Sequence, residues 1–155
     1  MLKVGIIGCG KIAEVRHAPD FAKNPEVELV AFYNRTQERA EAMAKKYGGK
    51  VYATIDELLS SDIDAVSVCN ANSDHAEVTI KALRAGKHVL CEKPMAVTLA
   101  DCEAMVMEAE KAGKLLMLAH NQRFMEAHVK AREMIEAGML GRILSFRTTF
   151  GHPGP

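Results

Sequence analysis

Val4-Gly5-Ile6-Ile7-Gly8-Cys9-Gly10-Lys11-Ile12-Ala13 is the stretch that decides the fold of this chain. An apolar run typical of a buried strand leads into a glycine-rich turn, and the turn leads into a helical segment. Gly8 permits a tight turn, Gly10 lets the backbone approach a pyrophosphate, and Ala13 keeps the helix close to the strand. The stretch predicts a dinucleotide-binding strand–turn–helix unit, although an ordinary strand-to-helix turn without a ligand has the same pattern.

Apolar, strand-like runs alternate with helical segments along the rest of the chain. The further runs are Val27–Tyr33, Lys50–Tyr52, Ala65–Cys69, His88–Cys91 and Leu115–Ala119. Apolar stripes with helical spacing begin at Leu99 and Phe124, and we expect both to face a core. This alternation predicts an α/β fold, a doubly wound and mostly parallel Rossmann sheet with helices on both faces.

Capping residues and glycines predict where the helices begin and end. Two threonines are expected to start helices and three glycines to end them: Thr54, Thr98, Gly86, Gly113 and Gly138. Pro19 is expected to end or kink the first helix near Ala18, because proline lacks the amide hydrogen that a helix interior requires.

Composition limits the function classes. The 155 residues include 20 basic and 20 acidic side chains, with no basic stripe of the kind that nucleic acid or an anionic membrane requires. We also find no apolar leader or membrane-spanning run, and we expect a cytoplasmic protein. The four cysteines have no metal-ligand spacing, so thiols in a reducing compartment and no metal site are expected.

Glu92-Lys93-Pro94 follows the strand-like run His88–Cys91 and places an ammonium group at the end of a strand. In a doubly wound sheet, the carboxyl ends of the strands open onto the ligand crevice. An ammonium group there stabilises a developing alkoxide or relays a proton, whereas a solvated lysine at the rim is the alternative. Lys93 is therefore the candidate catalytic residue.

The residues after the second strand bear on the choice of cofactor. Asn34-Arg35-Thr36 stands where an acidic side chain would bind the ribose hydroxyls of NAD. Arg35, Thr36 and Arg39 instead offer two guanidinium groups and a hydroxyl, which suit a 2'-phosphate. We predict NADP rather than NAD; a helix start capped by Thr36 with solvated arginines is the alternative.

Four motifs together resemble one family. The glycine turn, Asn72–His75, Glu92–Pro94, and His120–Phe124 followed by Gly141–Ile143 resemble the glucose–fructose oxidoreductase/inositol dehydrogenase/MocA (Gfo/Idh/MocA) family in order and spacing, over nearly the whole chain. The resemblance implies a nicotinamide-dependent oxidoreductase acting on a sugar, cyclitol or related polyol. It implies that Lys93 contacts the nicotinamide ribose and the substrate oxygen, with Glu92 positioning it.

The expected cofactor contacts come from the glycine turn, the ends of later strands and the resemblance. They are Gly8, Cys9, Gly10, Lys11, Ile12, Asn34, Arg35, Thr36, Arg39, Asn70, Asn72, His75, Glu92, Lys93, Gln122 and Arg123. Asn70-Ala71 departs from the family's usual threonine or serine followed by proline, so this turn is expected to be less rigid. Asn72 and Ser73 are expected to cap the next helix.

Three segments are expected: a dinucleotide-binding domain over 1–122, a connecting helix over 123–141, and over 142–155 the first strand of an otherwise absent α+β substrate and dimerisation domain. The family's proton-transfer histidine would lie further downstream, so the chain alone is expected to be inactive. The apolar face expected for Arg142–Phe150 predicts either disorder or pairing with another copy in a homo-oligomer. A non-catalytic dinucleotide-binding module or redox sensor is the alternative function.

Overall fold

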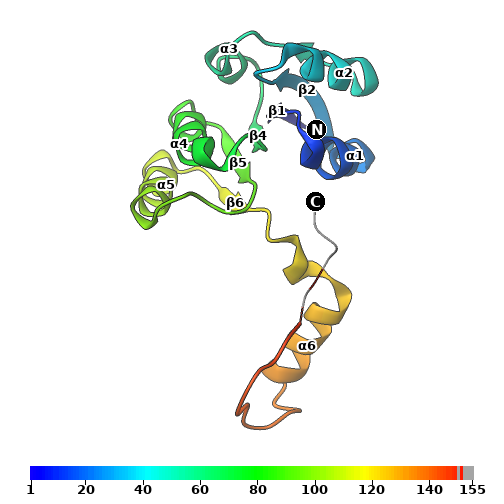
Figure 1. The fold of residues 1–155 in the computed structure, drawn as a ribbon, viewed down its shortest axis with the longest axis vertical. Helices are drawn as coiled ribbons and strands as arrows, with labels where there is room; N and C mark the ends of the chain where they lie inside the picture. The colour runs from blue at the N-terminus through cyan, green and yellow to red at the C-terminus, as the bar shows by residue number, and fades with distance from the viewer. Residues whose placement is uncertain (150, 152–155) are drawn as a thin grey trace. The chain divides into compact units, whose positions relative to one another are not determined.

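The computed structural model describes residues 1–149 and 151. Its centre is a parallel sheet in the order β3-β2-β1-β4-β5-β6, which is the doubly wound order of dinucleotide-binding domains (Figure 1). The strands are β1 (Leu2–Ile7), β2 (Val27–Tyr33), β3 (Lys50–Val51), β4 (Ala65–Val68), β5 (His88–Cys91) and β6 (Leu116–Leu118). The strands β2 to β6 each lie within one residue of the predicted runs, because continuous apolar runs identify strands buried on both faces.

Helices cover both faces of the sheet, as predicted. The helices up to residue 119 are η1 (Ala13–His17), α1 (Ala18–Lys23), α2 (Gln37–Tyr47), α3 (Ile55–Leu59), η2 (Asn72–Asp74), α4 (His75–Arg84) and α5 (Leu99–Ala112). Two further helices follow residue 119: η3 (Asn121–Phe124) and α6 (Glu126–Glu136). One core lies between the sheet and α3, α4 and α5, and the other between the sheet and η1, α1 and α2. Ile6 and Ile7, both fully buried, point into opposite cores because side chains alternate along a strand.

The predicted helix ends are mostly confirmed. Thr54 Oγ1 accepts a hydrogen bond from the Glu57 amide at 3.2 Å, and Thr98 Oγ1 accepts one from the Asp101 amide at 3.1 Å. The terminating glycines have positive φ angles. The caps expected from Asn72 and Ser73 were wrong, since neither η2 nor α4 has a side-chain cap.

Of the two predicted effects of Pro19, ending or kinking the first helix, the ending was wrong. The helix begins at Lys11, widens into a π turn at η1 and continues through α1 to Lys23. The Ala18 amide donates to the Ala13 carbonyl, five residues back, and Pro19 then falls in the first turn of α1. Proline is tolerated there because its missing amide hydrogen has no obligatory helical partner.

The chain divides into two compact units, Met1–Ala119 and a second that begins at His120. In the second unit, α6 has no buried residue, and Ile135 is 45% exposed, so the stripe from Phe124 is not a core face here. Arg142–Thr149 contains neither helix nor strand, and Phe150 lies outside the described residues. The strand and the domain limits expected there stay predictions.

Candidate cofactor and active site

The glycine turn is packed on one side and open on the other. Gly8 has φ +96°, and a Cβ atom there would lie 2.5 Å from the Asn70 nitrogen and the Cys69 carbonyl carbon. A Cβ atom on Gly10 would meet nothing within 4 Å. The helix starts immediately after it, so the first-turn amides have no helical partner. Open space at a helix N-terminus fits a pyrophosphate.

Two amides of this turn are already used within the protein. The Gly8 amide donates to the Tyr33 carbonyl at 2.8 Å, and the Cys9 amide donates to Asn34 Oδ1 at 2.9 Å. The Asn34 Nδ2 group donates in turn to the Thr36 carbonyl at 2.8 Å. Asn34 therefore connects the glycine turn to the residues after β2, and the amides of Gly8 and Cys9 already donate within the protein. Their predicted contacts with a cofactor stay predictions.

A cavity of about 320 Å³ joins segments that the sequence analysis singled out separately. Its lining includes Gly8, Asn34, Arg35, Thr36, Arg39, Asn70, Asp74 and Glu77. Among the described residues, neither Arg35 nor Arg39 forms a salt bridge, and the Thr36 side chain makes no capping bond. The two arginines and the hydroxyl are thus free to bind an anion, while Asp74 and Glu77 supply the acidic part of the lining.

A second cavity, of about 410 Å³, borders the same glycine turn. It is lined by Cys9, Gly10, Lys11, Glu14, Arg39, Ala42, Met43 and Lys46. Arg39 lines both cavities because its place in the first turn of α2 lies between them. Three cationic side chains therefore lie in the cavity that borders the glycine turn: Lys11, Arg39 and Lys46.

Asn70 and Asn72 differ in their surroundings. Asn70 follows β4 and lines the first cavity, and its buried Oδ1 atom has no hydrogen-bond partner in the described part of the chain. A buried acceptor without a partner costs free energy, so a ligand donor would stabilise it. Asn72 is exposed in η2 and lines neither cavity.

Glu92 and Lys93 follow β5 at the same edge of the sheet as the glycine turn after β1. Glu92 is 8% exposed, and its amide donates to the Val68 carbonyl of β4 at 2.9 Å. The Lys93 amide donates to Glu92 Oε2 at 3.0 Å, whereas the Lys93 side chain is exposed. Glu92 thus holds the main chain of Lys93, and no salt bridge involves Lys93 Nζ among residues 1–149.

His75 is bonded to the turn that follows β5. Its side chain is fully buried, and Nδ1 donates to the Pro94 carbonyl at 2.7 Å. His75 thus anchors the turn that carries Lys93, and its predicted contact with a cofactor stays a prediction. The Lys93–Pro94 peptide bond in this turn is cis.

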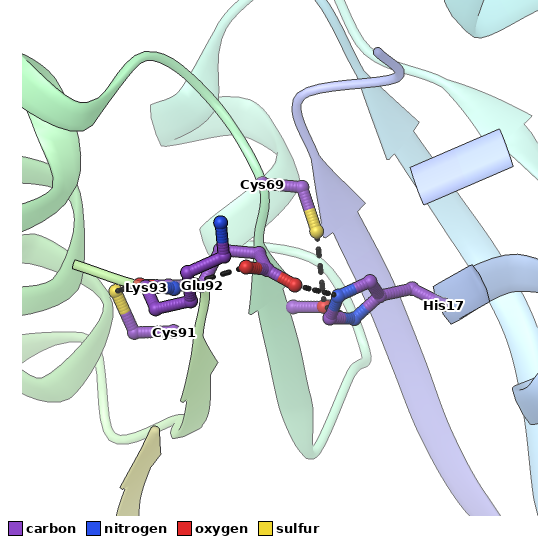
Figure 2. A network of polar contacts seen from close by, with 6 residues as sticks. His17, Cys69, Cys91, Glu92 and Lys93 are labelled. Atoms are coloured by element: carbon purple, nitrogen blue, oxygen red, sulfur yellow. Dashed lines mark hydrogen bonds and ion pairs between the residues drawn. The ribbon is translucent and has the colours of Figure 1, made fainter. Parts of the chain in front are cut away.

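His17 is the site residue that sequence reasoning missed. Its Nε2 atom lies 2.8 Å from Glu92 Oε1, and its Nδ1 atom lies 2.8 Å from Ser67 Oγ (Figure 2). The two partners come from different elements, and His17 and Glu92 are 75 residues apart in sequence. The one available signal was that His17 lies four residues after Ala13, on the helix face that packs on the sheet.

Three cysteines are buried near the carboxyl ends of β1, β4 and β5. Burial raises the pKa of the Cys9 thiol to about 12, of Cys69 to about 12 and of Cys91 to about 11. The thiols therefore stay protonated at neutral pH and are poor nucleophiles and metal ligands. Within residues 1–149 and 151, no group of three or more histidine, cysteine or acidic side chains is arranged to hold a metal ion.

Gln122 and Arg123 lie in η3, in the unit that begins at His120, and both are exposed. The Arg123 guanidinium lies 5.7 Å from the centre of the Phe124 ring. Their predicted contacts with a cofactor stay predictions. None of the described helices is both long and apolar enough to cross a membrane.

The family described as "Oxidoreductase family, NAD-binding Rossmann fold" (GFO_IDH_MocA) matches residues 2–120. The chain is 34% identical to myo-inositol 2-dehydrogenase of Thermotoga maritima, covering 99% of this chain and 46% of that protein. It is 39% identical to D-glucoside 3-dehydrogenase of Escherichia coli, covering 92% of this chain and 41% of that protein.

Among solved structures, the chain is similar to KijD10, a 3-ketoreductase from Actinomadura kijaniata in complex with NADP. The TM-score is 0.83 at 35% identity, covering 90% of this chain and 45% of that one. The chain thus spans less than half the length of these relatives. The glycine turn, the strand order and the family match together show that the chain belongs to the Gfo/Idh/MocA oxidoreductase family, of which it contains the NAD-binding Rossmann domain.

Proposed function

We propose that this chain is the cofactor-binding part of an NADP(H)-dependent oxidoreductase that transfers hydride to or from a carbon of a sugar, cyclitol or related polyol. The observation that carries the proposal is that the open glycine turn after β1 and Lys93 after β5 share one edge of a parallel sheet, with β4 between them. The names of the relatives, a myo-inositol 2-dehydrogenase and a D-glucoside 3-dehydrogenase, support the substrate class.

The residues present fit a nicotinamide dinucleotide. The amide of Gly10, just before the helix, and those of Lys11 and Ile12 in its first turn would hold the pyrophosphate, next to the open space at Gly10. The unpartnered Oδ1 atom of Asn70 would accept a hydrogen bond from the cofactor. When bound, the nicotinamide ring supplies or accepts the hydride.

Preference for NADP over NAD is supported by the charges around the first cavity. The position where an acidic residue would bind ribose hydroxyls is taken by Asn34, and its amide is engaged with Cys9 and Thr36. Arg35 and Arg39 are the guanidinium groups that would pair with a 2'-phosphate. The NADP bound to KijD10 is in line with this choice.

Lys93 is the residue that would act on the substrate. Its exposed ammonium group would stabilise negative charge on the substrate oxygen or pass a proton to it. Glu92 and His75 would fix the main chain on either side of it through the bonds to the Lys93 amide and the Pro94 carbonyl. The chain alone is expected to be inactive, because precise positioning of the substrate contributes much of the rate enhancement.

Calorimetric titration of the chain with NADPH and NADH tests the proposal. NADPH should bind more tightly, and Arg35→Ala should reduce the difference by about 1 to 3 kcal/mol, as expected for a charge-assisted contact. Lys23→Ala removes an exposed cation that lines neither cavity and should leave the difference unchanged. Equal affinities, or tighter binding of NADH, would contradict the preference for NADP.

A further inference from the structure

A row of hydrogen bonds, buried except for the last, connects the end of β4 with the main chain of Lys93. Ser67 Oγ lies 3.4 Å from Cys69 Sγ and 2.8 Å from His17 Nδ1. His17 Nε2 lies 2.8 Å from Glu92 Oε1, and Glu92 Oε2 accepts from the Lys93 amide at 3.0 Å. Figure 2 shows the side chains of His17 and Glu92 pointing toward each other.

The chemistry of the carboxylate fixes the direction of the two bonds that Glu92 makes. The Glu92 carboxylate accepts on both oxygens, so His17 Nε2 carries the hydrogen that it donates. Nδ1 of the same ring is hydrogen-bonded to the Ser67 hydroxyl, and the Ser67 oxygen is hydrogen-bonded to the Cys69 thiol. Burial keeps that thiol protonated by raising its pKa to about 12. Every member of the row therefore has a matching partner.

The π turn η1 places His17 in this row. Glu14, Val15 and Arg16 are exposed, whereas Ala13 and His17 at the two ends of the turn are buried. Widened turns of this kind occur often at functional sites. A buried histidine–carboxylate pair is also poor evidence for stabilisation, because desolvation offsets the attraction between the two groups. The arrangement is better explained by the hydrogen bond that the other Glu92 oxygen, Oε2, accepts from the Lys93 amide.

We propose that His17 is a positioning residue for Lys93: it fixes the Glu92 carboxylate, and the other oxygen of that carboxylate then fixes the main chain from which the Lys93 side chain reaches the crevice. The inference rests on the proposed function in one respect, the role of Lys93. His17 itself is 8% exposed and contacts neither cofactor nor substrate in this account. It acts only through Glu92.

The test compares His17→Leu, which removes the donor, with His17→Gln, which keeps an N–H group able to reach Glu92. Val15→Ala, in the same π turn but exposed, is the matched control. The direct readout is the amide signal of Lys93 in ¹H–¹⁵N spectra of the chain without cofactor, because a hydrogen bond to a carboxylate moves this signal downfield. The second readout is NADPH affinity by calorimetry, with thermal unfolding as the check on the fold.

His17→Leu should abolish the downfield position of the Lys93 amide and weaken NADPH binding about 2- to 10-fold, the equivalent of one hydrogen bond. His17→Gln should restore both, and Val15→Ala should change neither. If His17→Leu does not fold, Ser67→Ala replaces it, since loss of the bond at Nδ1 lets the ring turn away from Glu92 without removing His17. Ser67→Ala should displace the Lys93 amide signal in the same direction.

A Lys93 amide signal that is unchanged in His17→Leu, or in Ser67→Ala, overturns the inference even if stability falls, because a purely structural histidine would have that effect. A different result would contradict the proposed function. In that case the unmodified chain binds neither NADPH nor NADH, while the Lys93 amide signal, which is read without cofactor, still reports on His17.

Discussion

Gly8 and Gly10 are two residues apart and have different physical requirements. Gly8 combines φ +96° with backbone atoms 2.5 Å from the position of a Cβ atom, whereas Gly10 has open space on that side. The first glycine is therefore required by the fold. The second is required only if a ligand approaches the backbone there.

Substitution by alanine should separate these two requirements. Gly8→Ala should lower the free energy of unfolding by about 2 to 5 kcal/mol, from a left-handed backbone penalty plus overpacking. Gly10→Ala should change that free energy by no more than about 1 kcal/mol and weaken NADPH binding about 5- to 100-fold, because its methyl group overpacks against the pyrophosphate. Urea unfolding and calorimetry measure the two effects.

The reverse pattern would show that the turn does not bind the cofactor in this way. A Gly10→Ala variant with unchanged NADPH affinity would place the pyrophosphate elsewhere. A fully stable Gly8→Ala variant would mean that the turn can move away from Cys69 and Asn70.

For single residues, the sequence predicted which side chains line the site better than it predicted their hydrogen-bond partners. The cavity unites Gly8, Arg35, Thr36 and Arg39 as their positions after β1 and β2 suggested. The burial of His75 could not be predicted, because it depends on a bond to Pro94, which is 19 residues away in sequence. The pairing of His17 with Glu92 spans 75 residues and has no local signature.

At the scale of elements, the strands could be predicted because each is an apolar run with polar or glycine flanks. The helix starts at Thr54 and Thr98 could be predicted because capping is a local interaction. The π turn at Ala13–His17 could not, because it reflects how the helix accommodates Pro19 while keeping both Ala13 and His17 on the sheet.

The contact between α4 and α5 (Figure 1) includes an ion pair with a predictable response to acid. Arg84 Nη2 lies 2.8 Å from Glu108 Oε2. The hydrogen bond from Arg84 holds the pKa of Glu108 below its ordinary value of 4.5. A carboxyl group with a lowered folded-state pKa stabilises the fold above its unfolded pKa, and this stabilisation is lost as pH falls through the folded value.

Glu108→Gln should therefore be less stable than the unmodified chain at neutral pH, and the difference should narrow as pH falls below about 4.5. Urea unfolding at a series of pH values measures this. Glu103→Gln, at an exposed position of the same helix, is the control. Its difference in stability from the unmodified chain should not narrow as pH falls. A constant difference between Glu108→Gln and the unmodified chain would mean that the ion pair does not contribute to folding.

At the scale of the whole molecule, the stripe on α6 illustrates the limit of periodicity. The spacing of Ala127, Ala131 and Met134 predicts a helix, and α6 is one, but none of its residues is buried. Periodicity identifies an apolar face, whereas burial requires a partner surface. The family match ends at residue 120, and the chain spans less than half the length of its relatives.

Removal of the residues after Gly141, the tail, tests whether they promote association between copies. Leu144 and Phe146 are each 83% exposed, and exposed apolar segments with free backbone groups promote association between copies. The shortened chain should bind NADPH as before and self-associate less in sedimentation. Unfolding of the shortened chain would instead mean that the tail is part of a core.

A crystal structure of the chain grown with NADPH tests most directly where the cofactor binds. The predicted complex has the pyrophosphate at the amides of Gly10, Lys11 and Ile12, the 2'-phosphate at Arg35 and Arg39, and the nicotinamide ribose beside Lys93. NADPH bound anywhere other than the carboxyl edge of the sheet, or bound there with Lys93 turned away from the nicotinamide ribose, would contradict it.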